Sequence, residues 1–211
     1  MSCVDMDPNA SKRKHAHDGA QCNNPHCMAA DADAMIDRAY DELGWSMVGV
    51  FGDDMPHFAY TQFLNDKIGV DFVVMGKFEP IEFNDILLTA VPKLVAQWKE
   101  LDVASKLDQR IAAHGILQLN DDPPVDCPVE LQRVHPAYIR DGMFNQAQLR
   151  SANPITMVQI VVFDSRGKLP GDPEWSGDSM EQPDLFLDPD AHDDTEPATL
   201  PAIEITGFTI P

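Results

Sequence analysis

The chain has 211 residues and 44% of them are hydrophobic, so it is long enough and apolar enough to bury one substantial core. Asp and Glu number 35 against 15 Lys and Arg, which gives a formal net charge of −20 at pH 7. This charge argues against direct binding to nucleic acid or to anionic membranes, because both are themselves negative.

The acidity leaves several partners open. A basic protein surface, a metal ion or a small molecule fits it, and so does mimicry of DNA, although acidity also serves solubility alone. No run of about eighteen apolar residues occurs, so we expect no membrane-spanning helix. The N-terminus lacks the apolar core of a secretory signal and the cysteines are scattered, which together predict a cytoplasmic protein.

Residues 1–30 are predicted to form an N-terminal arm that carries a Cys/His cluster, because they show no apolar periodicity. Zinc prefers four nitrogen or sulfur ligands, and the candidates here are Cys22, His26, Cys27 and His17. The spacing matches no standard zinc finger. A zinc ion that organises the arm and an arm with incidental Cys and His are therefore both open interpretations.

The first half of the chain alternates helix and strand signals. Residues 31–44 predict a helix that ends at Gly44, with an apolar stripe of Met35, Ile36, Ala39, Tyr40 and Leu43. Residues 45–51 and 57–64 predict a hairpin, and 70–76 a third strand, paired antiparallel across short turns. Residues 79–101 predict a helix that begins near Pro80 and is kinked or split at Pro92.

The second half adds three more strands and a helix. Strands are predicted at 110–120, at 127–135 and at 155–164, the last being the most hydrophobic and hence central. In 127–135, Val129 and Leu131 alternate with Glu130 and Gln132. Residues 136–152 predict one helix. From residue 171 the composition is that of an extended or disordered segment, and the last residues, "IEITGFTIP", are apolar enough to dock on the domain.

These elements predict an α+β fold, with a mostly antiparallel sheet packed against two or three helices and irregular N- and C-terminal arms. The single domain is expected to span 31–187, and 188–211 form an acidic, Pro-rich C-terminal tail.

The order of several motifs resembles the family called domain of unknown function 4262, which occurs in bacterial, plasmid and phage proteins. The motifs are "ELGWSMVGVF", "PHFAYTQFL", "VDFVVMGKFEPIEFNDILLTAV", "CPVELQRVHP" and "MVQIVVFDSRGKLPGDPEW", followed by "QP" at 182–183. That family usually has a Gly two residues after the Thr of the second motif, where this chain has Phe63, and Pro-Trp after the last turn, where this chain has "LPGDPEW". The resemblance implies a fold and a microbial source but no activity.

A polar pocket is predicted around the second strand. In a strand, Phe58, Tyr60, Gln62 and Leu64 share one face and His57, Ala59, Thr61 and Phe63 the other. Polar groups inside such apolar strands suit a pocket wall, although a Tyr in a core with its hydroxyl bonded to backbone is the simpler interpretation. The candidates are His57, Tyr60, Thr61, Gln62, Gln159 and Asp164, with Gln159 included because a buried Gln needs partners.

No catalytic signature accompanies these residues. No Ser lies in a Gly-x-Ser-x-Gly turn, and no glycine loop suited to phosphate occurs. The first hypothesis is therefore a non-enzymatic protein-interaction factor of a bacterium, phage or mobile element. The alternative is a small-ligand-binding protein or enzyme that uses the pocket around Tyr60, Thr61 and Gln62.

Overall fold

The computed structural model describes residues 25–52, 56–101, 108–119, 125–164, 166, 168, 172–175, 181–189 and 203–205. The helices are α1 (Pro25–Leu43), α2 (Asn65–Ile68), α3 (Pro80–Leu101), α5 (Pro136–Arg140) and α6 (Asn145–Arg150). The strands are β1 (Ser46–Val50), β2 (His57–Gln62), β3 (Asp71–Gly76), β4 (Ile111–Leu119), β5 (Val125–Arg133), β6 (Met157–Val162) and β7 (Ile203–Ile205).

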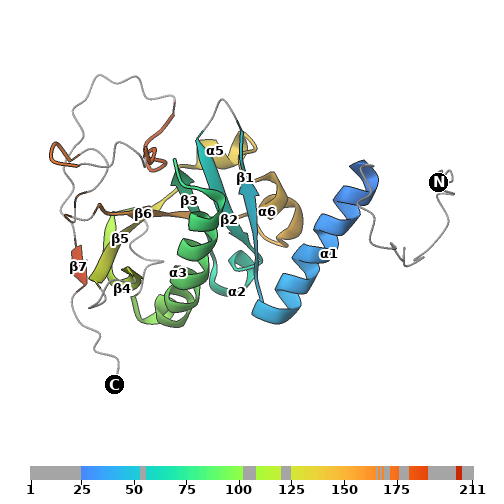
Figure 1. The fold of residues 1–211 in the computed structure, drawn as a ribbon, viewed down its shortest axis with the longest axis horizontal. Helices are drawn as coiled ribbons and strands as arrows, with labels where there is room; N and C mark the ends of the chain where they lie inside the picture. The colour runs from blue at the N-terminus through green and yellow to red at the C-terminus, as the bar shows by residue number, and fades with distance from the viewer. Residues whose placement is uncertain are drawn as a thin grey trace, which may run out of the picture.

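One seven-stranded sheet organises the molecule, in the order β1-β2-β3-β6-β5-β4-β7 (Figure 1). The β3–β6 and β4–β7 pairs are parallel and the other four pairs are antiparallel. The α+β fold with a mostly antiparallel sheet is therefore confirmed. The apolar strand β6 is central, as its composition predicts, and Ile203–Ile205 of the apolar C-terminal stretch does dock, beside β4.

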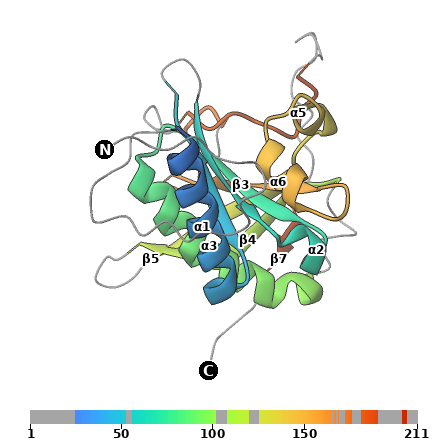
Figure 2. The same cartoon turned by 90° about the vertical axis from the view of Figure 1, so that its right-hand side faces the viewer.

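The sheet has a core on each face. The first core lies under α3 and contains Phe72, Val74, Phe83, Leu87, Leu94, Leu131, Val158 and Ile160. The second core lies under α5 and α6 and contains Phe58, Tyr60, Val73, Val134, Phe144, Met157 and Leu185. Figure 2 shows α3 and α6 on opposite sides of the sheet, with α1 in front of its β1 edge. Strands buried on both faces explain the continuous apolar runs of β3 and β6.

Three helix predictions need correction. α1 begins at Pro25, so the last six residues of the predicted 1–30 arm are helical in backbone. α3 is one helix that continues through the solvent-exposed Pro92, so it is not split there, and the kink at Pro92 stays a prediction. The helix predicted over 136–152 is divided into α5 and α6, because Gly142 takes a left-handed conformation at φ 86°.

The predicted face of Leu64 is wrong. Phe58 and Tyr60 do share the second core, but Leu64 lies in the first core together with Ala59. The reason is Phe63, whose φ of 74° ends the strand alternation. None of the helices in the described part of the chain is long and apolar enough to span a membrane.

Candidate functional site

Thr61 belongs to a buried hydrogen-bond network built around Asp71. Thr61 Oγ1 donates to Asp71 Oδ1 at 2.8 Å and accepts from the backbone N–H of Phe72 at 2.8 Å. The backbone N–H groups of Leu64 and Asn65 donate to the same carboxylate at 3.2 and 3.3 Å. Burial raises the pKa of Asp71 to about 6, although these hydrogen bonds oppose the shift. The network holds the turn after β2, which is a structural role.

Tyr60 is a core residue. Its ring lies edge-on to Phe144 at 5.4 Å and stacks on Phe58 at 6.0 Å, and the side chain is buried. Burial raises the pKa of Tyr60 to about 12, and a hydrogen bond with the backbone of Gln146 acts in the opposite direction. The hydroxyl is therefore protonated at neutral pH and unsuited to act as a base.

His57 and Asp164 lie apart from Tyr60 and from each other. His57 Nδ1 is 3.5 Å from the carbonyl oxygen of Phe78, and its ring is edge-on to Phe51 at 5.4 Å. Asp164 closes its own turn, because its Oδ1 accepts from the backbone N–H of Lys168 at 2.9 Å. The predicted pocket residues thus serve several separate contacts.

Gln159 contacts a segment that we call the strap, residues 181–189, which crosses the sheet over β5 and β6. Gln159 Nε2 donates to the carbonyl of Pro183 at 2.7 Å. Its Oε1 accepts from the backbone N–H of Leu185 at 3.0 Å and from Gln132 Nε2 at 2.7 Å. Every polar group of this buried side chain is satisfied inside the protein, as a buried amide requires.

Gln182 and Leu185 fix the strap further. The Gln182 amide donates to the carbonyl of Val162 at 2.8 Å and accepts from its N–H at 2.9 Å, so it pairs with β6 as a neighbouring strand does. Leu185 fills the second core, and its carbonyl accepts from the backbone N–H of His135 at 2.7 Å. The strap is thereby part of the folded domain.

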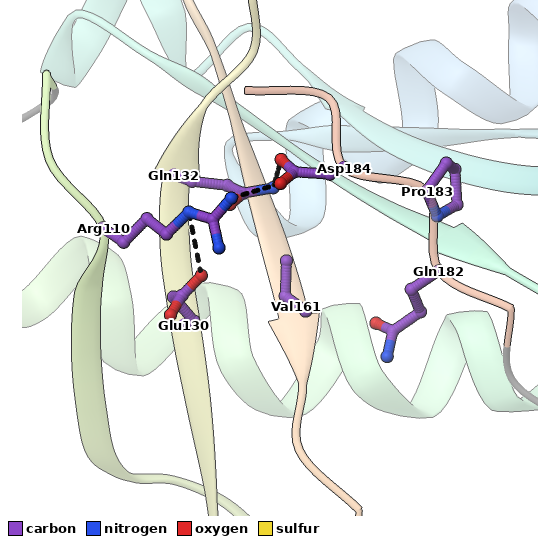
Figure 3. Close-up of a pocket in the computed structure, with 7 residues that line it drawn as sticks. All are labelled: Arg110, Glu130, Gln132, Val161, Gln182, Pro183 and Asp184. Carbon is purple, nitrogen blue, oxygen red and sulfur yellow. Dashed lines mark hydrogen bonds and ion pairs between the residues drawn. The ribbon is translucent and has the colours of Figure 1, made fainter. Parts of the chain in front are cut away.

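A charged cluster lies beneath the strap (Figure 3). Arg110 forms an ion pair with Asp184 and lies 3.8 Å, Nε to Oε1, from the buried Glu130. Gln132 Nε2 donates to Asp184 Oδ1 at 2.9 Å. Burial raises the pKa of Glu130 to about 7; Arg110 opposes this shift and Asp184 adds to it. Glu130 is thus able to exchange a proton near neutral pH.

The hollow beside this cluster has a volume of only about 10 Å³. Such a volume holds about one water molecule and no organic substrate. The cluster therefore serves to hold the strap.

No sequence pattern predicts that four residues lie together beneath the strap: Arg110, Glu130, Gln132 and Asp184. The alternation in 127–135 does place Glu130 and Gln132 on one face. It gives no sign that this face is covered, because the strap comes from a stretch whose composition is that of an extended or disordered segment.

An open apolar groove, which we call the α1–β1 groove, lies at the edge of the sheet. Its volume is about 370 Å³. Its lining consists of Ala32, Met35, Ile36, Ala39 and Leu43 from α1, with Trp45, Ser46, Met47 and Val48 from the start of β1. These α1 residues include most of the apolar stripe predicted from the sequence. The stripe lines a groove instead of a closed core, and Met35 and Leu43 remain 69% and 53% exposed.

Gln62 lies behind the groove. Its Oε1 accepts from Ser46 Oγ at 3.3 Å, and its Nε2 is buried without a hydrogen-bond partner in the described part of the protein. None of the predicted pocket residues lines the α1–β1 groove or the hollow under the strap.

α1 is attached to the domain by charged and aromatic contacts on its other flank. Arg150 of α6 forms ion pairs with Asp33 and Asp37 of α1, and its guanidinium lies over the Phe63 ring at 5.9 Å. Phe63 in turn contacts the ring of Tyr40 at 4.6 Å. These contacts hold α1 alongside β1 and leave the groove between them open.

The predicted zinc site falls largely outside the described residues. His17 and Cys22 are not among them, and for His26 and Cys27 only the α1 backbone is. Within the described residues, no group of three or more His, Cys, Asp or Glu side chains is arranged to hold a metal ion. The N-terminal zinc site stays a prediction.

Comparison of the chain with models of protein families, with curated proteins and with solved structures gives no match.

Proposed function

We propose that this protein is a non-enzymatic interaction factor, which binds a partner protein in the α1–β1 groove. The observation that carries the proposal is the open apolar groove itself, at the edge of the sheet. An amphipathic helix normally buries its apolar stripe, and a contiguous exposed apolar surface marks a binding site. A partner that covers Met35 and Leu43 would complete the burial that α1 lacks.

The alternative of a ligand pocket around Tyr60, Thr61 and Gln62 has less support. Tyr60 packs in the second core and Thr61 bonds to Asp71, so neither side chain is available to a ligand. From the motif resemblance we further propose a bacterial, phage or mobile-element source and action in the cytoplasm. The charge of −20 favours a basic partner over nucleic acid.

A capture experiment tests the proposal. The protein is used as bait in lysate of its natural host, together with a groove variant, Met35→Lys/Leu43→Lys. Both substituted positions are solvent-exposed, so the variant is expected to fold. The matched control is Ile81→Lys/Leu88→Lys, which alters two exposed apolar positions of α3 outside the groove.

The expected result is one protein recovered in stoichiometric amount by the unchanged bait and by the control, and lost with the groove variant. Recovery of the same proteins by all three baits, or of no stoichiometric partner by any, contradicts the proposal.

A further inference from the structure

β1 is an edge strand whose sequence lacks the residues that usually protect an edge. In the described part of the chain, β1 pairs only with β2, so its outer edge has no partner strand. Natural edge strands are commonly protected by Lys, by Pro or by inward-pointing charges, because a bare edge recruits further strands. β1 reads Ser-Met-Val-Gly-Val and contains none of these. α1 lies in front of this edge (Figure 2), and the α1–β1 groove opens between the two, so an added strand would enter between β1 and α1.

The groove follows this edge. Successive side chains of a strand point to opposite faces of the sheet. The groove contacts four consecutive residues, 45–48, so it runs along the strand edge and not over one face alone. The apolar stripe of α1 forms the facing wall. A segment in the groove would have β1 backbone on one side and apolar side chains on the other.

An extended segment fits this space better than a helix. An added strand lies about 4.8 Å from its neighbour and exchanges backbone hydrogen bonds with it. A helix is about 10 Å wide and has already used its backbone groups internally. It therefore would leave the outer edge of β1 unsatisfied.

Charge selects the chemistry of the occupant. Asp33 and Asp37 of α1 are paired with Arg150 on the other flank of the helix. The local negative charge therefore comes from Asp41 and Glu42 at its C-terminal end, against Arg38. The whole chain carries −20, so a second copy of it would be repelled, whereas a segment flanked by Lys or Arg would be attracted.

We propose that the α1–β1 groove binds an extended peptide segment of alternating apolar residues, flanked by Lys or Arg, which pairs with β1 as an eighth strand. This inference rests on the proposed function, because it specifies what the partner presents to the groove. Backbone pairing would supply affinity, and the apolar side chains and basic flanks would supply selectivity.

The test is to select binders of the full chain from a displayed library of random short peptides. The winners are then tested against the groove variant, Met35→Lys/Leu43→Lys, and the control, Ile81→Lys/Leu88→Lys. The expected winners alternate apolar and polar residues between basic ends, and they bind the control but not the groove variant. Backbone N-methylation of a winner is expected to weaken binding about fivefold at every second residue and little at those between, since each lost pairing costs roughly 1 kcal/mol.

Other outcomes overturn the inference in distinguishable ways. Winners with apolar residues at helical spacing, or with no period-two response to N-methylation, overturn strand addition but leave a groove-binding partner in place. If the peptide selection gives no winner but the lysate experiment shows groove-dependent capture, strand addition is likewise overturned and a groove-binding partner stays in place. No winner and no groove-dependent capture rejects the proposed function as well. A dimer of the free protein that the groove variant dissociates would identify a second copy as the occupant and overturn the inference.

Discussion

Two buried carboxyl groups dominate the electrostatics of the fold at the scale of single residues. Asp71 and Glu130 both lie under 6% exposed, and burial raises their pKa values to about 6 and about 7. A group whose pKa is raised by folding binds its proton more tightly in the folded state. Its contribution to stability is therefore complete below the unfolded pKa and is lost as pH rises through the folded pKa.

The free energy of unfolding is accordingly expected to fall between about pH 4 and pH 7, the range between the unfolded and folded pKa values of Asp71 and Glu130. Glu130→Gln removes the part of this decrease that comes from the ionisation of Glu130, which is about 3 kcal/mol over this range. Urea unfolding at several pH values across the range measures the free energy of unfolding and hence the decrease. The control is Glu181→Gln, on an exposed strap residue, which should keep the slope of the unchanged protein. An unchanged slope in Glu130→Gln would mean that Glu130 ionises normally.

Phe63 is a second residue with a measurable cost, because its φ of 74° is unfavourable for any side chain but suits glycine. Phe63→Gly and Phe63→Ala both lose the contact with Tyr40. Only the Gly variant relieves the backbone, so it should be the more stable of the two by about 1 kcal/mol in chemical unfolding. At a position with negative φ, the Ala variant is instead the more stable of the two. An Ala variant at least as stable as the Gly variant would contradict the left-handed conformation.

At the scale of elements, the attachment of α1 decides whether the groove keeps its shape. Arg150 links α1 to α6 through Asp33 and Asp37, in an exposed setting where each pair is worth well under 1 kcal/mol. Its position over Phe63 adds a contribution of similar size. α1 is thus held by several weak contacts, and loss of Arg150 should loosen the helix without unfolding the sheet.

Arg150→Ala is expected to speed amide hydrogen exchange in α1 by about threefold to tenfold, while exchange in β3 and β6 stays unchanged. Mass spectrometry of exchanged peptides measures this. Arg140→Ala, at an exposed position of α5, is the matched control and should leave the rate of amide hydrogen exchange in α1 unchanged. Equal exchange in both variants would show that other contacts hold α1.

The elements also show what the sequence can predict. Apolar runs identify β2, β3 and β6, and helical spacing identifies α3, since burial leaves its mark in composition. They do not distinguish a stripe that packs in a core from one that lines a groove, as on α1. They also miss the strap, because Gln182 and Asp184 dock through polar contacts that only the folded sheet provides. The division at Gly142 depends on one backbone angle, which helical periodicity does not encode.

The sheet of the whole molecule has two edge strands, β7 at one end and β1 at the other, and neither has a strand beyond it in the described residues (Figure 1). The apolar α1–β1 groove lies at the β1 end. The β1 end is also where α1 presents its apolar stripe beside an excess of carboxylates. These features place the proposed binding surface at the β1 end and direct it towards a basic partner.

The most direct test of this surface is site-specific photo-crosslinking in cells of the natural host. A photoreactive amino acid replaces Met35, which lines the groove, or Ile81, which is similarly exposed on α3. If a partner binds in the α1–β1 groove, we expect a covalent adduct with one defined host protein from position 35 and none from position 81. Adducts that form equally at both positions, or at neither, would contradict a partner bound in the α1–β1 groove.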